Sequence, residues 1–457
     1  MKKQNSIKAL IFSGLLLSAC NNSQINSSYS SFSSNDLGSS TTSINNSNQT
    51  GNSSTGGSYS SSNSSSNGHS HSFVIENNDE VNHWLECACE EKSEIENHKF
   101  ETAIDENDNE IEKCSVCNYV SGTWFTNKAQ LNDYAYSFAV VGDTQSLCRI
   151  YPQHMDTLYD WIIDNKDDKK IEYVFGLGDI TDTWKKTSTA EWDVAKEAIS
   201  QMDGVLPYSL TRGNHDENSY FNEYFGYEEY KNQFDGFYND EINNSYRYFT
   251  IGQTNYLFLT LEYAPTDKEL EWANEVIADH PNHKVIITTH GYLYDDGTPI
   301  GVHDTNVYST SSVIDYDKTR VYNNGDQMWD KLVSRHSNIL MIMSGHVVSD
   351  VLVSKNTGVH GNEVTQLLVN PQSMDADVEA TGMVCMLYFN EKGDEVQVEY
   401  ISTVKEQYYK QSNQFSFTLE NRECEKHEYI EKYDEVNHWL ECECGYIHNK
   451  ELHHLFH

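Results

Sequence analysis

The segment "IEYVFGLGDITD" (residues 171–182) decides the fold class, because it joins an apolar run to a group of acidic side chains. The run at 171–177 is rich in apolar and aromatic residues, which is typical of a buried strand. Gly178 then allows a tight turn, and Asp179 follows it directly. In α/β sheets ligands bind beyond the carboxyl ends of the strands, so this segment predicts a site at a sheet edge.

The same arrangement recurs at four other places in the chain. Each time, an apolar run ends in a short polar segment that carries metal-type ligands. These segments are "GDTQ" (142–145), "RGNHD" (212–216), "TTH" (288–290) and "SGH" (344–346), and they end apolar runs at 134–142, 205–210, 284–289 and 338–344. Singly, each also fits a helix cap, a turn or a buried core histidine. Together they predict five strand ends that face one site.

Amphipathic segments alternate with these strands. Residues 152–165 carry apolar side chains at helical spacing. Thr266 with Glu269, and Ser188 with Glu191, each predict a capping box at the start of a helix. Strands that alternate with such helices predict a layered α/β domain, which we place at about 132–410.

The charge of the chain limits its partners. It contains 31 Lys and Arg against 70 Asp and Glu, for a formal net charge of −39. Such a surface repels nucleic acid and anionic membranes, which argues against nucleic-acid binding as such. It would also repel a phosphate ester, so a phosphate site here requires local positive charge that metal ions can supply.

The order and spacing of the five segments resemble the calcineurin-like metallophosphoesterase family. The motifs of that family run D-x-H, G-D-x-x-D/N, G-N-H-D/E, H and G-H-x-H, and the resemblance covers residues 134–405. It implies a four-layer α/β/β/α sandwich that uses two divalent metal ions (Mn, Fe, Zn or Mg). Such a pair, about 3.5–4 Å apart, clamps a phosphoryl group and generates a hydroxide nucleophile.

The same resemblance implies roles for individual residues. Asp179 would bridge the two metals, with Asp143 and Gln145 on the first. The second metal would be held by Asn214, His290 and His346. His215 would assist the leaving group, and the adjacent Asp216 is expected to orient the His215 imidazole.

Two positions depart from the family pattern. Gln145 stands where the family usually has His, and Val348 stands where the second His of G-H-x-H would bind the first metal. The first site would then depend on solvent or on a nearby group such as Ser349 or Asp350. It would favour a hard, oxygen-preferring ion such as Mn²⁺ or Mg²⁺.

These observations leave more than one function open. The first is a cell-surface phosphohydrolase that cleaves phosphodiesters or phosphomonoesters of small molecules or of the cell envelope. The alternative is a surface binding protein with an inactive phosphoesterase fold, which Val348 favours and the presence of His215 opposes. A zinc-capturing lipoprotein would rest on the 19 histidines alone. The Tyr-rich stretch 218–241 would either form the rim of the site or be a solvated insert that its aromatic residues pin to the domain.

The N-terminus predicts export. Lys2 and Lys3 precede an apolar stretch at 7–17, and "LSAC" ends at Cys20. This pattern indicates a signal peptide at 1–20 and resembles the bacterial lipobox, which implies a lipid anchor on Cys20 at the extracellular face of the membrane. An ordinary signal peptide is the alternative. The Ser- and Asn-rich residues 21–68 would then be a flexible tether.

Two copies of a short repeat flank the α/β domain. "DEVNHWLECAC" (79–89) and "DEVNHWLECEC" (434–444) are identical at ten of eleven positions, and they define modules at 69–120 and 421–457. Cys-x-Cys is unsuited to an internal disulfide and suits a metal. We therefore predict a structural zinc site, with disulfides in an oxidising exterior as the alternative. Its predicted ligands are Cys87, Cys89, Cys114 and Cys117, with His83 and His98 as competitors.

Overall fold

The computed structural model describes residues 71–453, except 74, 80, 90, 94, 105–109, 127–130, 183–188, 253, 302–321, 373, 375, 421–427, 435 and 443–446. The predicted signal peptide with Cys20, and the predicted tether at 21–68, lie outside the described residues. Within the described ranges, no helix is both long and apolar enough to cross a membrane.

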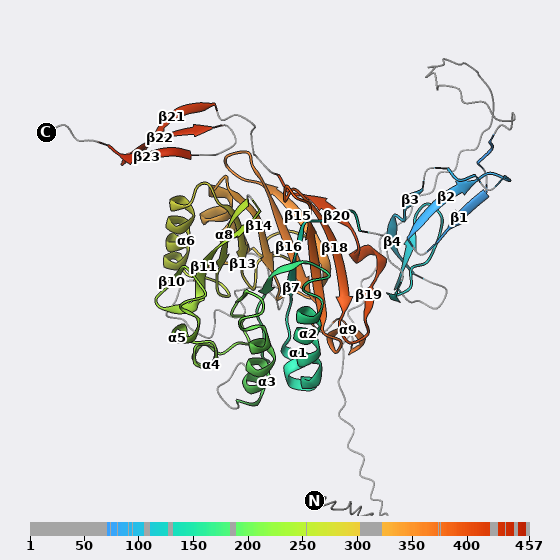
Figure 1. Cartoon of the computed structure of the whole chain (residues 1–457), viewed down its shortest axis with the longest axis horizontal. Coiled ribbons are helices and arrows are strands. Elements are labelled where there is room, and N and C mark those ends of the chain that lie inside the picture. The colour runs from blue at the N-terminus through green and yellow to red at the C-terminus, as the bar shows by residue number, and fades with distance from the viewer. Residues whose placement is uncertain are drawn as a thin grey trace, which may run out of the picture. The chain divides into compact units, whose positions relative to one another are not determined.

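Two large sheets form the centre of the α/β domain (Figure 1). The first has the order β6 (Trp124–Phe125), β19 (Gln407–Tyr409), β18 (Glu395–Ser402), β17 (Met383–Phe389), β7 (Tyr136–Val141), β8 (Ile171–Gly176) and β9 (Tyr208–Leu210), and β20 (Ser416–Thr418) pairs with β18. The second has the order β10 (Gly236–Tyr238), β11 (Glu241–Ile251), β12 (Thr254–Thr260), β13 (Lys284–Thr288), β14 (Ile339–Ser344), β16 (Glu363–Asn370) and β15 (Ser349–Thr357). Because β6 and β20 pair into the first sheet, that sheet extends beyond the predicted bounds of 132–410.

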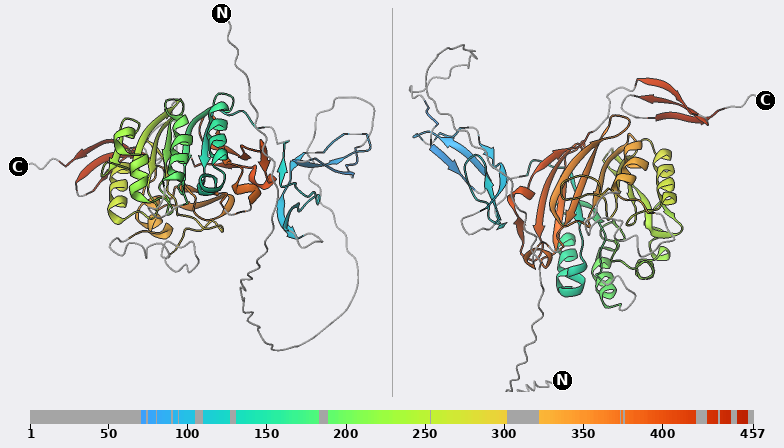
Figure 2. Two further views of the ribbon diagram at one scale, coloured as in Figure 1. Left: turned by 90° about the horizontal axis from the view of Figure 1, so that it is seen from below. Right: turned by 180° about the vertical axis from the view of Figure 1, so that it is seen from behind.

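Helices cover the outer face of each sheet (Figure 2). On the first sheet these are α1 (Gln145–Ile150), α2 (Pro152–Asp164), α3 (Ala190–Ile199), α4 (Asn218–Tyr224) and α5 (Tyr227–Tyr230). On the second sheet they are α6 (Asp267–Asp279) and α8 (Gly325–Lys331). The remaining short elements are α9 (Ala376–Glu379) and the 3₁₀ turns η1 (Ser200–Met202), η3 (Val333–Arg335) and η4 (Gln411–Asn413).

Alternation along the strands builds three separate layers of core. In β7, Phe138 packs between the two sheets, whereas Ala139 packs under the helices of the first sheet. In β12, Phe258 likewise packs between the sheets, and Leu257 packs under α6. Side chains of both sheets therefore share one central core, and the four-layer α/β/β/α sandwich is confirmed.

Local sequence signals set most of the helix ends. The predicted capping box at Thr266 is present, because Glu269 accepts the Thr266 backbone N–H at 2.6 Å, and α6 ends two residues before Pro281. The predicted box of Ser188 with Glu191 falls partly outside the described residues, which include only Glu191. Its carboxylate accepts the backbone N–H of Asp182 at 2.7 Å, and α3 begins after Thr189. Ser188 lies outside the described residues.

The Tyr-rich stretch 218–241 belongs to the core. It forms α4, α5 and β10, and its aromatic side chains Phe221, Phe225 and Tyr230 are fully buried. Phe221 and Phe225 pack with the indole of Trp192 on α3 at ring-centroid distances of 6.3 and 6.4 Å. The aromatic side chains therefore pin this segment to the core, as the second alternative above supposes, while polar residues such as Glu228 and Glu229 stay exposed.

The two repeat copies form small sheets of their own. The first contains β1 (Ile75–Asn78), β2 (Asn82–Glu86) and β3 (Glu96–Asn97), followed by the hairpin of β4 (Phe100–Ile104) and β5 (Glu110–Cys114). The second contains β21 (Tyr429–Tyr433), β22 (Asn437–Cys442) and β23 (Ile447–Leu452). Each near-identical stretch therefore supplies the middle strand of a three-stranded antiparallel sheet.

Candidate metal centre

Parallel strands bring the predicted ligands together. β7, β8 and β9 run parallel in the first sheet, and β12, β13, β14 and β16 run parallel in the second. Their carboxyl ends therefore meet at one edge of the sandwich. Each predicted ligand follows one of these ends: Asp143 after β7, Asp179 after β8, Asn214 after β9, His290 after β13 and His346 after β14.

Three ligand atoms converge on one point. The Nε2 of His290 lies 3.1 Å from Oδ2 of Asp179 and 3.1 Å from Oδ1 of Asn214. His290 donates its Nδ1 hydrogen to the carbonyl oxygen of Leu177 at 2.8 Å, so Nε2 carries a lone pair when the ring is neutral. The contacts of Nε2 with these two oxygen atoms would be satisfied either by a proton on the ring or by a cation bound among the three atoms. The ligand atoms of Asp179, His290 and His346 all lie within 4.8 Å of one another, which fits a divalent metal.

The neighbouring group contains Asp143 and Gln145. Asp143 is fully buried, and its carboxylate accepts the backbone N–H of His346 at 3.2 Å and the Nδ2 of Asn370 at 2.9 Å. Gln145 is 1% exposed, yet neither its amide oxygen nor its nitrogen has a hydrogen-bond partner among the described residues. A buried amide without a partner is rare in folded proteins, and a metal ion would satisfy its oxygen.

The charges of the site favour a bound cation. Burial raises the pKa of Asp143 to about 8, with nearby Asp179 adding to the effect, although His290 opposes it. Burial also acts to raise the pKa of Asp179, but the charge of His290 outweighs it and lowers that pKa to about 2. Burial alone would lower the pKa of His290, and the two carboxylates instead raise it to about 9. Without a metal, burial thus favours the neutral form of Asp143 beside the Asp179–His290 ion pair, whereas a bound cation would favour the ionised carboxylate.

The backbone of the site is strained in the way that functional sites are. Asp179 has a φ of 47° and His346 a φ of 70°, a region that residues with a side chain seldom adopt. A Cβ atom on Gly213 would lie 2.1 Å from Oδ1 of Asp179, and one on Gly345 would lie 2.4 Å from Oδ1 of Asp143. These two glycines therefore make room for the two carboxylates.

His215 lies beside these ligands and is oriented by Asp182. Its backbone N–H donates to Oδ1 of Asp179 at 2.8 Å. Its Nδ1 lies 3.1 Å from the carbonyl oxygen of Asp182 and 3.3 Å from Oδ1 of the same residue. The other carboxylate oxygen of Asp182 contacts the guanidinium of Arg149. Nδ1 is thus engaged, and Nε2 is the nitrogen left to act on a substrate.

Asp216 does not orient His215, contrary to the prediction from their adjacency. Its buried carboxylate accepts the backbone N–H groups of Thr181 at 2.9 Å, Gly213 at 2.9 Å and Ile180 at 3.2 Å. Neighbours along an extended or turning chain point in different directions, which explains the error. Asp216 instead ties the loop after β8 to the loop after β9.

The structure adds two residues that sequence reasoning missed. Asn370 is the last residue of β16, and its side chain donates to the carboxylate of Asp143, as described above. Tyr263 follows β12, and its ring lies 5.6 Å from that of His290 and 5.1 Å from that of His346. The buried Tyr263 hydroxyl has no partner among the described residues. Both follow apolar runs, at 254–260 and 363–370, so the signal that found the other five segments was available for these two.

Ser349 and Asp350 were the two residues considered as metal ligands in place of the histidine that Val348 replaces. The carboxylate of Asp350 pairs with Lys410 at 2.8 Å and with Asn413 at 3.1 Å. It is thus already engaged in an ion pair. Ser349 begins β15, directly after the half-buried Val348.

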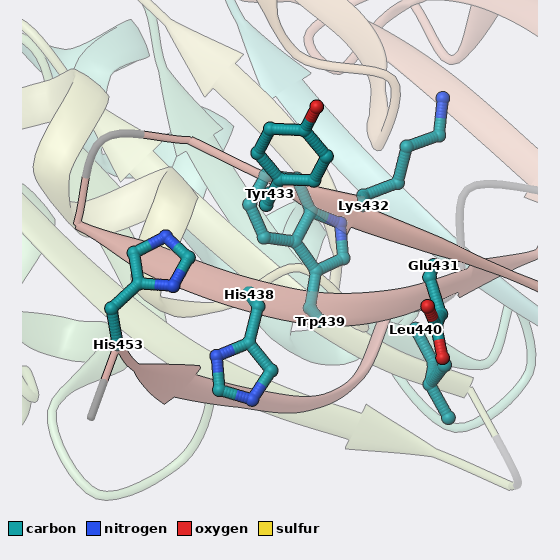
Figure 3. Close-up of a pocket in the computed structure, with 7 residues that line it drawn as sticks. All are labelled: Glu431, Lys432, Tyr433, His438, Trp439, Leu440 and His453. Atoms are coloured by element: carbon teal, nitrogen blue, oxygen red, sulfur yellow. The ribbon is translucent and has the colours of Figure 1, made fainter. Parts of the chain in front are cut away.

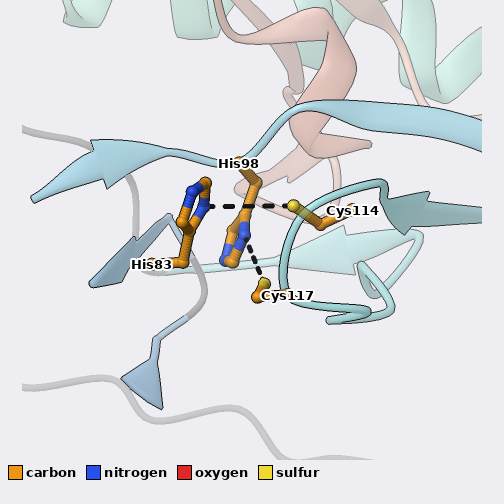
Figure 4. A group of neighbouring side chains, drawn as sticks. All are labelled: His83, His98, Cys114 and Cys117. Atoms are coloured by element: carbon orange, nitrogen blue, oxygen red, sulfur yellow. Dashed lines mark hydrogen bonds between the residues drawn. The ribbon is translucent and has the colours of Figure 1, made fainter. Parts of the chain in front are cut away.

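The predicted zinc ligands separate into two groups, of which Figure 4 shows the one with Cys114 and Cys117. Cys114 and Cys117 lie with His83 and His98, whereas Cys87 and Cys89 lie with His71. The four-cysteine set is therefore not the one that the structure gathers. The near-identical repeat stretch places Cys87 and Cys89 after β2, whereas the other two cysteines end a separate hairpin.

Comparison with known proteins adds a family and several relatives. Residues 136–350 match the family model described as calcineurin-like phosphoesterase. The chain is 28% identical over 292 residues to the uncharacterized protein YvnB of Bacillus subtilis (strain 168), a match that covers 60% of this chain and 20% of YvnB. The chain therefore spans about a fifth of the length of this relative.

Among solved structures, the chain is similar to two phosphatases. One is a dimetal phosphatase from Danio rerio, with a TM-score of 0.41 and 13% identity over 63% of this chain and 100% of that chain. The other is the purple acid phosphatase PPD1 from yellow lupin (Lupinus luteus) seeds, with a TM-score of 0.40 and 12% identity over 74% of this chain and 59% of that chain.

Proposed function

Residues 136–350 are a calcineurin-like phosphoesterase domain, and on this basis we propose that the chain is a metal-dependent hydrolase of phosphodiesters or phosphomonoesters. The observation that carries the proposal is the convergence of three ligand atoms. Nε2 of His290 lies 3.1 Å from Oδ2 of Asp179 and 3.1 Å from Oδ1 of Asn214. A buried, orphaned amide at Gln145 supports a second ion next to the first.

The ligands divide between two divalent ions. Asp179 would be a ligand of both ions. Asp143 and Gln145 would be the other protein ligands of the first ion, and Asn214, His290 and His346 would be those of the second. When bound, the ions would polarise the phosphoryl oxygens and supply a hydroxide nucleophile. The low pKa of Asp179, about 2, keeps this residue ionised and ready to bind metal.

His215 would deliver a proton to the leaving oxygen. Its Nδ1 is fixed by Asp182, so a proton held at Nε2 is presented in one orientation. The His215 side chain is 29% exposed, which leaves it accessible to a substrate while it stays in contact with the carboxylate behind it. Arg149 neutralises that carboxylate and adds one positive group to an otherwise acidic surface.

We further propose that the chain acts at the extracellular face of the membrane, held by lipid on Cys20. The support for this location is the basic, apolar and small-residue pattern of residues 1–20. A lipid-anchored hydrolase would meet either small phosphate esters or phosphate esters of the cell envelope.

The first test is hydrolysis of bis-p-nitrophenyl phosphate by the full chain loaded with Mn²⁺. His215→Ala is expected to lower kcat by about 10²–10⁴-fold, the usual contribution of a general acid. Asp179→Asn is expected to abolish turnover. Asp193→Asn is the matched control, because this α3 carboxylate, among the residues that the structure describes, accepts only from the hydroxyl of Tyr224 and lies outside the proposed ligand set.

The outcomes separate the two functions. Equal activity of the Asp179→Asn and Asp193→Asn variants would refute the metal assignment. Tight Mn²⁺ binding without turnover on the diester, and then on p-nitrophenyl phosphate, would support the binding-protein alternative that Val348 suggested.

A further inference from the structure

A second cluster of metal-type ligands lies in the first repeat module. His83 lies on β2, His98 lies between β3 and β4, Cys114 ends β5, and Cys117 follows in the next turn. One ligand atom from each of these four residues lies within 4.8 Å of the others. Figure 4 shows the two imidazoles side by side, each joined to one cysteine sulfur.

The distances match a tetrahedral metal shell. The Nδ1 of His98 lies 3.3 Å from the sulfur of Cys117, and the Nδ1 of His83 lies 3.9 Å from the sulfur of Cys114. Around Zn²⁺, with Zn–S of about 2.3 Å and Zn–N of about 2.0–2.1 Å, nitrogen and sulfur ligands are about 3.6 Å apart. The two observed distances lie on either side of this value.

The outer ring nitrogens fix the tautomers that a metal requires. His98 Nε2 lies 2.8 Å from the carbonyl oxygen of Asp79, which can only accept, so Nε2 carries the hydrogen. Nδ1 of His98 is then an unprotonated lone pair that faces a thiol group. Metal-binding histidines are typically supported in this way by a carbonyl or a carboxylate on the second nitrogen. Nε2 of His83 lies 4.0 Å from the carboxylate of Glu96, which is beyond hydrogen-bond distance.

The segment from Cys114 to Tyr119, which carries both cysteines, forms a tight turn. Cys114 donates its backbone N–H to the carbonyl oxygen of Tyr119 at 2.8 Å and accepts the N–H of Asn118 at 3.0 Å. Asn118 has a φ of 61°, a left-handed conformation that Asn tolerates. The backbone N–H of Val116 points at the sulfur of Cys114, 3.4 Å away, and would stabilise a thiolate.

We propose that His83, His98, Cys114 and Cys117 bind one zinc ion in a closed, tetrahedral Cys₂His₂ site. Four protein ligands leave no open position, so the site is structural. It joins the three-stranded sheet of β1, β2 and β3 to the hairpin of β4 and β5. Zinc binding would stabilise the folded state of this small module, because the module has only a small hydrophobic core of its own.

The second repeat copy repeats the histidine half of this arrangement. His453 Nε2 lies 2.8 Å from the carbonyl oxygen of Asp434, as His98 does from Asp79. His438 and His453 have ring centroids 5.5 Å apart and line a pocket with Tyr433 and Trp439 (Figure 3). Both copies therefore contain a pair of adjacent histidines, one of which contacts the backbone carbonyl of an aspartate. In the first copy, the hairpin of β4 and β5 and the turn after it also supply the sulfur atoms of Cys114 and Cys117.

Cobalt substitution of the full chain tests this site. Reduced, metal-free protein is titrated with Co²⁺, and the thiolate-to-cobalt charge-transfer absorption is followed. This band needs sulfur ligands, and the phosphoesterase ligand set contains none, so the two kinds of site are distinguished without an activity assay. We expect Cys114→Ser/Cys117→Ser to lose at least about nine-tenths of the band, because only the thiolate gives the transition. The matched control Cys87→Ser/Cys89→Ser should keep it.

X-ray absorption on the unaltered, zinc-loaded chain provides a readout that does not depend on a variant folding. Two sulfur and two nitrogen neighbours per thiolate-bound zinc are expected. Four sulfur neighbours, or loss of the cobalt band in Cys87→Ser/Cys89→Ser with retention in Cys114→Ser/Cys117→Ser, would overturn the proposal. So would absence of the band in protein whose thiols are shown to be reduced.

Discussion

Gly213→Ala should disable the proposed metal centre without unfolding the domain. The added Cβ would lie 2.1 Å from Oδ1 of Asp179 and 2.2 Å from the backbone nitrogen of the same residue. Because a backbone atom is one of the two obstacles, a change of side-chain rotamer cannot relieve the contact. Non-bonded heavy atoms need about 3.5 Å, so the loop after β8 must move by roughly 1 Å or more.

The structure gives the size of the effect. Asp179 is the ligand shared between both proposed ions, and its Oδ1 also accepts the backbone N–H of His215. A displacement of about 1 Å at a reacting centre lowers the rate by about 10²-fold. Overpacking of this kind typically destabilises a domain by about 1–3 kcal/mol, which leaves the fold intact for most domains.

The assay compares this variant with Gly204→Ala. Gly204 has a φ of 73° and open space around its missing Cβ, so its substitution carries backbone strain of about 1 kcal/mol but no clash. Turnover of bis-p-nitrophenyl phosphate and Mn²⁺ affinity by calorimetry are measured for both, with urea unfolding as the check on folding. Equal Mn²⁺ affinity in the two variants would refute the role given to Gly213.

Three further predictions follow from the same contacts. Asp182→Ala should lower kcat by about 10–100-fold with unchanged Mn²⁺ affinity, because it removes the carboxylate beside Nδ1 of His215, leaves only the backbone carbonyl to hold the ring, and touches no metal ligand; an equal loss of affinity would contradict this. Asn370→Ala should destabilise the domain by about 1–3 kcal/mol in urea unfolding of the metal-free chain, because it leaves the buried carboxylate of Asp143 short of a donor; an unchanged midpoint would argue against that bond. Intact mass of the membrane fraction should show acyl chains on Cys20, and an unmodified Cys20 would reject the lipid anchor.

The sequence was sufficient for the fold class and for most of the residues that gather at the proposed metal centre. Apolar runs such as 171–177 and 338–344 became β8 and β14, because buried parallel strands need continuous apolar side chains. The polar residues directly after them had to gather at one edge, since parallel strands share a direction. The same rule would have found Tyr263 and Asn370 if the runs before them had been treated in the same way.

The sequence by itself therefore determined which segments form strands, which polar residue follows each strand, and at which edge of the sheets these residues gather. These features depend on patterns within a few residues. Tertiary structure decided which side chains meet. Asp182, and not the adjacent Asp216, contacts the imidazole of His215 because the loop after β8 folds back over the loop after β9. The repeat module likewise brings Cys114 and Cys117 beside His83 of another sheet and His98 of the segment between β3 and β4. Such contacts depend on where separate loops lie in space, and the spacing of residues along the chain does not determine those positions.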